Sequence, residues 1–154
     1  MKSERILSAL GYAGLIPFVA GCVISALGDN DLGRAVFLSY SATILSFLGG
    51  TLWGRLIANP ALSGQAVGLV LLGASNGFAL LGWLALVLSF SPVQGPALLP
   101  FVCLTLGFVL LFFCEIRGLP RVAETIHRRY SAFRAFLTVT VLLLHGVFFL
   151  LQQG

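Results

Sequence analysis

The stretch from Ala66 to Phe90 reads AVGLVLLGASNGFALLGWLALVLSF and contains no charged side chain. An α-helix rises about 1.5 Å per residue, so a helix over this stretch is long enough to cross a hydrocarbon core about 30 Å thick. Lipid offers no hydrogen-bond partner to main-chain N–H and C=O groups, which favours a helix over an irregular segment. The stretch therefore predicts a membrane-spanning helix.

The composition of the whole chain agrees with this interpretation. Hydrophobic residues make up 58% of the 154 residues and charged residues only 9%, whereas an ordinary soluble domain carries about 25% charged residues. A soluble domain of this size exposes a large share of its surface and has no room to bury so much apolar area. The composition therefore indicates an integral membrane protein.

Four further apolar stretches have the length of membrane-spanning helices. Together with the first, the expected helices cover residues of about 6–28, 35–58, 66–90, 97–116 and 133–151. Polar or helix-breaking residues separate them, as at Asp29 and at Pro60. We expect an all-α fold, a polytopic membrane protein whose single domain over residues 1–154 is a bundle of five transmembrane helices.

The distribution of basic residues predicts the orientation of the chain. If the N-terminus lies inside, only Arg34 among the nine Lys and Arg residues lies outside, in agreement with the positive-inside rule. The first apolar stretch is too long for a signal-peptide core and lacks a small-x-small cleavage site. We therefore expect a multi-pass protein of the bacterial cytoplasmic (inner) membrane, with a cytoplasmic N-terminus and a periplasmic C-terminus.

The segment between the fourth and fifth expected helices predicts a short interfacial amphipathic helix over about residues 120–132. Val122, Ile126 and Tyr130 recur at a spacing of four and share one face, while a solvated basic loop is the alternative. The residues expected to bind anionic lipid headgroups at the inner face are Arg117, Arg121, Arg128, Arg129 and Arg134. The basic cluster is short and lies between membrane segments, so we expect no nucleic-acid partner.

Small residues predict where the helices pack, because helices in lipid associate by close approach. Ala42, Ser46, Gly50 and Gly54 are spaced by four along the second expected helix, and Gly73 and Gly77 share a face of the third. We expect these two helices at the centre of the bundle. In the first helix, Pro17 removes a main-chain hydrogen bond and predicts a kink that frees the carbonyl near Ala13.

Two motifs resemble those of a known family. Residues 10–18 read LGYAGLIPF and resemble its start, L-G-x-A-G-L-I-P-F, while residues 44–54 read ILSFLGGTLWG and resemble its second signature, I-L-S-F-L-G-G-x-x-W-G. A weaker third match comprises Tyr130, Arg134, Leu137 and Thr138. The family is a bacterial inner-membrane family of domains of unknown function, related to a small animal mitochondrial inner-membrane transmembrane protein. It often has His or Arg where this chain has Leu52. The resemblance implies fold and location and supplies no mechanism.

Four polar side chains within or beside the expected spans are candidates for ligand or polar contacts, because such groups are costly in lipid. They are Asn76, His145, Arg55 and Glu115. Arg55 and Glu115 lie near the inner ends of their helices, where they either form an ion pair or extend separately to the headgroups. Asn76 suits an interhelical hydrogen bond or a ligand contact, and His145 suits a packed or hydrogen-bonded core position.

The sequence predicts no enzyme, and no cofactor or metal. It contains no H-E-x-x-H, no G-x-S-x-G and no Gly-rich phosphate loop, and no carboxylates are paired within a span. Cys22, Cys103 and Cys114 lie in apolar stretches, where an odd number argues against a disulfide framework. Cys22, Cys103 and His145 fall at similar depth and suit copper, zinc or haem, but no paired spacing supports such a site.

These observations leave two main functional hypotheses. The first is a non-enzymatic protein that assists the assembly or stability of other membrane components, with a membrane-protein partner. The second is a binder or carrier of a small hydrophobic molecule, such as a quinone or a lipid, in a pocket shaped by Pro17, Asn76 and His145. A redox or metal site is a third and weaker hypothesis.

Overall fold

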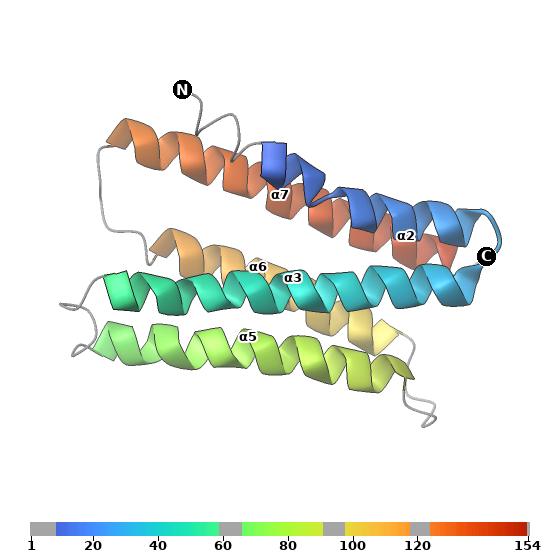
Figure 1. Cartoon of the computed structure of the whole chain (residues 1–154), viewed down its shortest axis with the longest axis horizontal. Helices are drawn as coiled ribbons and strands as arrows, with labels where there is room; N and C mark the ends of the chain where they lie inside the picture. Colours follow the sequence, from blue (N-terminus) through green and yellow to red (C-terminus); the bar gives the residue numbers. More distant parts are fainter. Residues whose placement is uncertain (1–8, 59–65, 91–97, 118–123, 154) are drawn as a thin grey trace. The chain divides into compact units, whose positions relative to one another are not determined.

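The chain folds into α-helices that match the expected architecture. The computed structural model describes residues 9–58, 66–90, 98–117 and 124–153, with side chains except at 117 and 124–130. Its helices are α2 (Ile16–Ala26), α3 (Asn30–Ala58), α5 (Ala66–Phe90), α6 (Leu98–Arg117) and α7 (Glu124–Leu151) (Figure 1). Five spans are long and apolar enough to cross a membrane, and no strand occurs among the described residues. The prediction of an all-α protein with five such helices is confirmed.

The first span is interrupted close to Pro17. Residues 9–13 are helical, a turn follows at Gly14 and Leu15, and α2 then begins at Ile16. The Leu15 N–H donates to the Tyr12 carbonyl at 3.0 Å, a tighter i−3 bond than the α-helical pattern. Proline has no main-chain N–H to donate, so the α-helical hydrogen bonding is interrupted in the turn before Pro17.

The fifth span differs from its predicted start. One helix of 28 residues, α7, runs from Glu124 to Leu151 across the expected boundary between an interfacial helix at 120–132 and a separate span at 133–151. Neither Pro nor Gly occurs between Glu124 and Leu144, so nothing breaks the main-chain hydrogen-bond pattern. Residues 120–123, including the predicted helix start at Pro120, lie outside the described residues.

The chain divides into two compact units, Met1–Tyr40 with Pro120–Gly154, and Ser41–Leu119. In the first unit, α2 packs against α7 although the two are far apart in the sequence (Figure 1). The first turns of α3 approach α2 closely, because a Cβ added to Gly33 would lie 2.9 Å from the Gly21 carbonyl oxygen. Gly28, at φ +101°, forms the turn between α2 and α3, and Asp29 accepts the Leu32 N–H at 3.0 Å as a helix cap.

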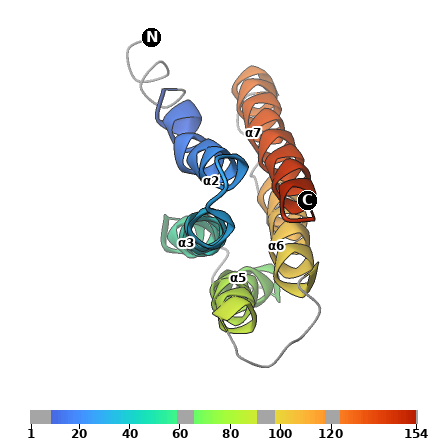
Figure 2. The ribbon, with the colours of Figure 1, turned by 90° about the vertical axis from the view of Figure 1, so that its right-hand side faces the viewer.

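The second unit contains the rest of α3 with α5 and α6, and Figure 2 views these helices close to their axes. Glycines mark the contacts. A Cβ on Gly49 of α3 would lie 2.9 Å from the Phe78 Cβ of α5, and one on Gly107 of α6 would lie 2.6 Å from the Leu45 side chain. Leu52 is fully buried. It occupies the position at which the family with similar motifs often has His or Arg.

Candidate functional site

His145 lies in an aromatic cluster of the first unit. Its side chain is 2% exposed, and the ring centroids of Phe37 and Phe18 lie 4.9 and 6.0 Å away. Phe148 stacks on Phe37 at 4.3 Å. The His145 Nδ1 lies 2.9 Å from the Val141 carbonyl oxygen, which only accepts, so Nδ1 carries the proton in this arrangement. The surroundings are those of the packed, hydrogen-bonded core histidine expected from the sequence.

The two polar groups expected to shape one ligand pocket have different surroundings. Asn76 is exposed on α5 in the second unit, whereas His145 is enclosed by phenylalanine rings in the first. The structure does not bring them together within either unit. No group of three His, Cys, Asp or Glu side chains able to hold a metal ion occurs in the described part of the chain.

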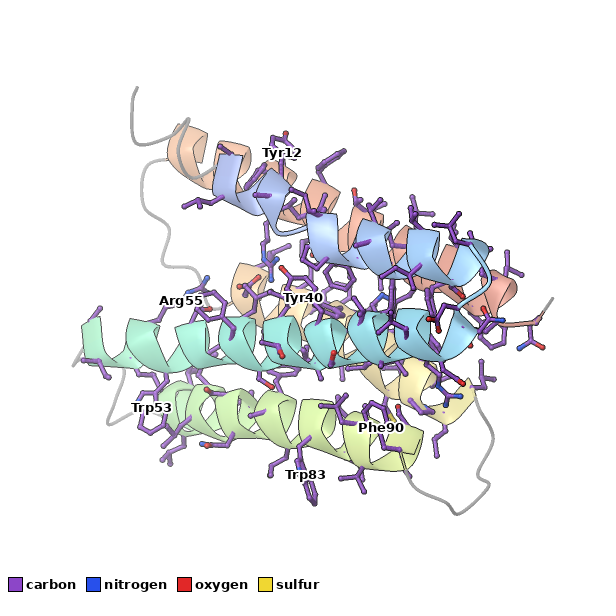
Figure 3. All side chains as sticks on the ribbon, turned by 45° about the vertical axis from the view of Figure 1, so that its right-hand side comes forward. Tyr12, Tyr40, Trp53, Arg55, Trp83 and Phe90 are labelled. Carbon is purple, nitrogen blue, oxygen red and sulfur yellow. The ribbon has the colours of Figure 1, made fainter. Side chains whose placement is uncertain are left out.

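A tyrosine that sequence reasoning missed lies at the break in the first span. The Tyr40 hydroxyl of α3 donates to the Gly14 carbonyl at 3.0 Å, beside the carbonyl of Ala13 that Pro17 deprives of its helical donor. Figure 3 shows Tyr40 directed from α3 towards this part of the chain. The available signal was a hydroxyl within an apolar stretch, which needs a partner in lipid.

A second missed group joins the two ends of the first unit. The Gln152 Nε2 donates to the Ser25 Oγ at 2.9 Å and to the Asn30 carbonyl at 3.5 Å, and the Ser25 hydroxyl donates to the Asn30 Oδ1. The hydrogen bonds connect the C-terminal end of α7 with the turn between α2 and α3. This arrangement fixes the end of one helix against two others.

Arg134, predicted to contact lipid headgroups, has a side chain that is only 9% exposed. It lies on the buried side of α7, at the three- and four-residue spacing of a helix face, with Thr138, Val141, His145 and Phe148. The other predicted headgroup ligands, Arg117, Arg121, Arg128 and Arg129, lie outside the described side chains.

Arg55 and Glu115 contact each other in the second unit through a main-chain carbonyl, and the ion pair that was one of the two alternatives stays a prediction. The Arg55 Nη1 donates to the main-chain carbonyl of Glu115 at 3.1 Å, and the Glu115 side chain is 2% exposed. The guanidinium lies near the C-terminal end of α6, where a positive charge is favourable against the helix dipole and the last carbonyls.

Asn76 forms its hydrogen bond within its own helix rather than between helices. Its Nδ2 donates to the Leu72 carbonyl one turn earlier at 3.1 Å, and the side chain is exposed. The interhelical bond predicted for Asn76 is therefore absent among the described residues. The residue projects from α5 on the side away from its buried contacts.

The predicted packing glycines do not contact another described helix. A Cβ on Gly50, Gly54, Gly73 or Gly77 would meet no atom of the described residues within 4 Å. Ser46 does lie at a helix contact, since its hydroxyl oxygen would be 3.1 Å from a Cβ on Gly82 of α5. Neighbouring residues of a helix point about 100° apart, and α3 turns Gly49, not Gly50, towards α5.

Comparison with known proteins supports the membrane assignment. The chain is 36% identical over 132 residues to Transmembrane protein 69 of Xenopus tropicalis, which covers 84% of this chain and 48% of that protein. The chain thus spans about half the length of this curated relative. No solved structure matches this chain. A family described as "Protein of unknown function (DUF3429)" matches residues 3–150. These matches confirm the family resemblance of the two motifs, and the chain belongs to this DUF3429 family of multi-pass membrane proteins of unknown function.

Proposed function

We propose that the chain is a non-enzymatic membrane protein that binds another membrane protein and assists the assembly or stability of a larger complex. The observation that carries this proposal is the open face of α3, formed by Phe47, Gly50, Gly54 and Ile57. Phe47 and Ile57 are 68% and 72% exposed, and a Cβ at either glycine would meet nothing within 4 Å among the described residues. The two glycines allow a helix of a partner to approach the main chain of α3 closely.

The proposal also includes an orientation and a lipid contact. With the N-terminus cytoplasmic and the C-terminus periplasmic, the basic residues between α6 and the span of α7 lie beside the inner leaflet of a bacterial cytoplasmic membrane. Arg117, Arg121, Arg128 and Arg129 then attract anionic headgroups. The composition, with few carboxylates and no catalytic motif, supports a binding role over catalysis.

The test compares native mass spectra of the protein released gently from its own membrane. We expect a stoichiometric partner protein with the wild-type chain and its loss with Gly54→Leu, because a leucine at this face holds the partner helix away. Gly146→Leu is the matched control, since Gly146 of α7 is likewise exposed with no atom within 4 Å of its Cβ position among the described residues. A chain that carries no partner in native membranes, or a partner insensitive to Gly54→Leu, overturns the proposal.

A further inference from the structure

The helix α5 has two faces of opposite character. The face buried in the second unit consists of Gly68, Leu71, Ser75, Phe78, Gly82 and Ala85. The opposite side, which we name the open face of α5, consists of exposed residues at the alternating four- and three-residue spacing of a helix contact: Leu69, Gly73, Asn76, Leu80, Trp83 and Val87. Figure 3 shows Trp83 directed away from the helix. This face runs along the whole span.

Asn76 makes this face unlike an ordinary lipid-facing surface. It lies near the middle of the Ala66–Phe90 span, and its hydrogen bond to Leu72 uses one of its two amide N–H groups. It makes no other hydrogen bond to the described residues. Lipid supplies neither donor nor acceptor at this depth, so the second N–H and the Oδ1 require a partner that lies against α5.

The neighbouring glycines permit such a partner to come close. Gly73 precedes Asn76 by one turn and Gly77 follows it, and a Cβ at either position would meet no atom within 4 Å among the described residues. A pair of glycines four apart on an apolar span is the pattern through which two helices approach with their main chains nearly in contact. Close approach brings an amide at Asn76 within reach of the facing helix.

The chemistry of the amide favours a second copy of this chain as the occupant. Two copies inserted in the same orientation are related by an axis along the membrane normal, so each residue on the contact meets its equivalent at the same depth. An amide both donates and accepts, which makes Asn76 complementary to itself. We infer that two copies associate through the open face of α5, with their Asn76 side chains hydrogen-bonded to each other.

The size of this face predicts a reversible dimer. A 25-residue helix is about 37 Å long, and a contact about 10 Å wide covers on the order of 400 Å² per copy. Stable interfaces of soluble proteins bury about 800 Å² per partner. The contact area alone is therefore too small for a permanent dimer, and the pair of amides and the close glycine approach set its affinity and its register.

Disulfide cross-linking in membranes tests the contact. In a full-length chain with Cys22, Cys103 and Cys114 replaced by alanine, we expect Leu80→Cys to form disulfide-linked dimers on mild oxidation. Leu80 lies one turn from Asn76 on the open face and leaves the amide in place. Leu106→Cys on α6, which is 54% exposed, is the matched control and is expected to stay monomeric. A monomeric Leu80→Cys chain, or equal dimer yields for both variants, overturns the inference.

A second measurement isolates the amide. Energy transfer between labelled full-length chains in lipid vesicles is expected to report dimers about tenfold weaker for Asn76→Leu, and close to wild type for Asn76→Gln, which keeps an amide. Helix content and thermal stability of the monomer are expected to stay unchanged, because Asn76 is exposed. Equal affinity of Asn76→Leu and wild type overturns the inference.

This inference goes beyond the proposed function, because it concerns another face and another partner. Loss of a heterologous partner with Gly54→Leu while Leu80→Cys stays monomeric supports the proposed function and refutes the self-association. Dimers of Leu80→Cys in a chain without a heterologous partner support the self-association and refute the proposed function.

Discussion

At the scale of single residues, two adjacent glycines of α3 have opposite surroundings. A Cβ on Gly49 would lie 2.9 Å from the Phe78 Cβ and 3.3 Å from the Ser75 carbonyl oxygen, whereas a Cβ on Gly50 would meet no described atom within 4 Å. We expect Gly49→Ala to lower the free energy of unfolding in detergent by about 1–3 kcal/mol. Gly50→Ala is expected to leave it unchanged or raise it by less than about 1 kcal/mol, because alanine favours helix. Equal losses for both variants would contradict the packing of α3 on α5.

The hydroxyl of Tyr40 provides a second prediction at this scale. Tyr40→Phe removes the hydrogen bond to the Gly14 carbonyl and keeps the ring that packs on Phe18 at 5.0 Å. We expect a loss of about 0.5–1.5 kcal/mol in the free energy of unfolding, measured by denaturant titration in detergent. Tyr12→Phe is the control, because Tyr12 is half exposed and packs through its ring against Phe133. If both variants lose the same stability, the Tyr40 bond does not support the break before Pro17.

The sequence predicted the residues of these contacts only in part. Pro17 predicted the break, since a missing N–H acts locally in the helix. The hydrogen bond from Tyr40 to the Gly14 carbonyl was not predicted. The two residues lie 26 positions apart in the sequence, and their approach depends on how two helices pack. Likewise, the spacing of small residues predicted a close contact at Gly50, but the rotation of α3 about its axis turns Gly49 towards α5 instead.

At the scale of helices, the residue at which a helix begins depends on side-chain caps and on whether a helix breaker interrupts it. The start of α3 at Asn30, earlier than the expected 35, follows from the Asp29 side chain that caps the first turn. The number of spans was predictable because lipid demands long apolar helices. The union of two expected helices into α7 was not, because amphipathic periodicity continued by an apolar stretch does not locate a boundary unless a helix breaker lies there.

The hydrogen bonds of Gln152 give a prediction at the helix scale. Gln152→Ala removes both bonds that connect the end of α7 with Ser25 and Asn30. We expect faster amide hydrogen exchange, by a few-fold or more, in the turn around Asp29, because this turn loses its connection to α7. Gln153→Ala is the control, since Gln153 is an exposed neighbour of the same type. Unchanged exchange in Gln152→Ala, or the same increase in both variants, would contradict a stabilising role.

At the scale of the whole molecule, the proposed topology of five crossings, with a cytoplasmic N-terminus, places the C-terminal end of α7 on the periplasmic side. We expect alkaline phosphatase fused after Gly154 to be active in a bacterial host and a fluorescent protein fused there to stay dark. The pair of fusions after Ala58, at the end of α3 that this topology places in the cytoplasm, is the control and is expected to give the opposite pattern. A bright fluorescent fusion after Gly154 would contradict the proposed orientation.

The pairing of α2 with α7 has a consequence for how the protein is made. The helices of the second unit follow one another in the chain, whereas α2 packs on α7, which is synthesised after all of them. About 100 residues separate Ala26 from Glu124, which corresponds to about 5–20 s of translation at 5–20 residues per second. During this delay Phe18 of α2 and Phe37 of α3 lack their packing partners His145 and Phe148. A nascent chain therefore exposes α2 and early α3 to membrane chaperones and quality-control proteases until α7 has been synthesised.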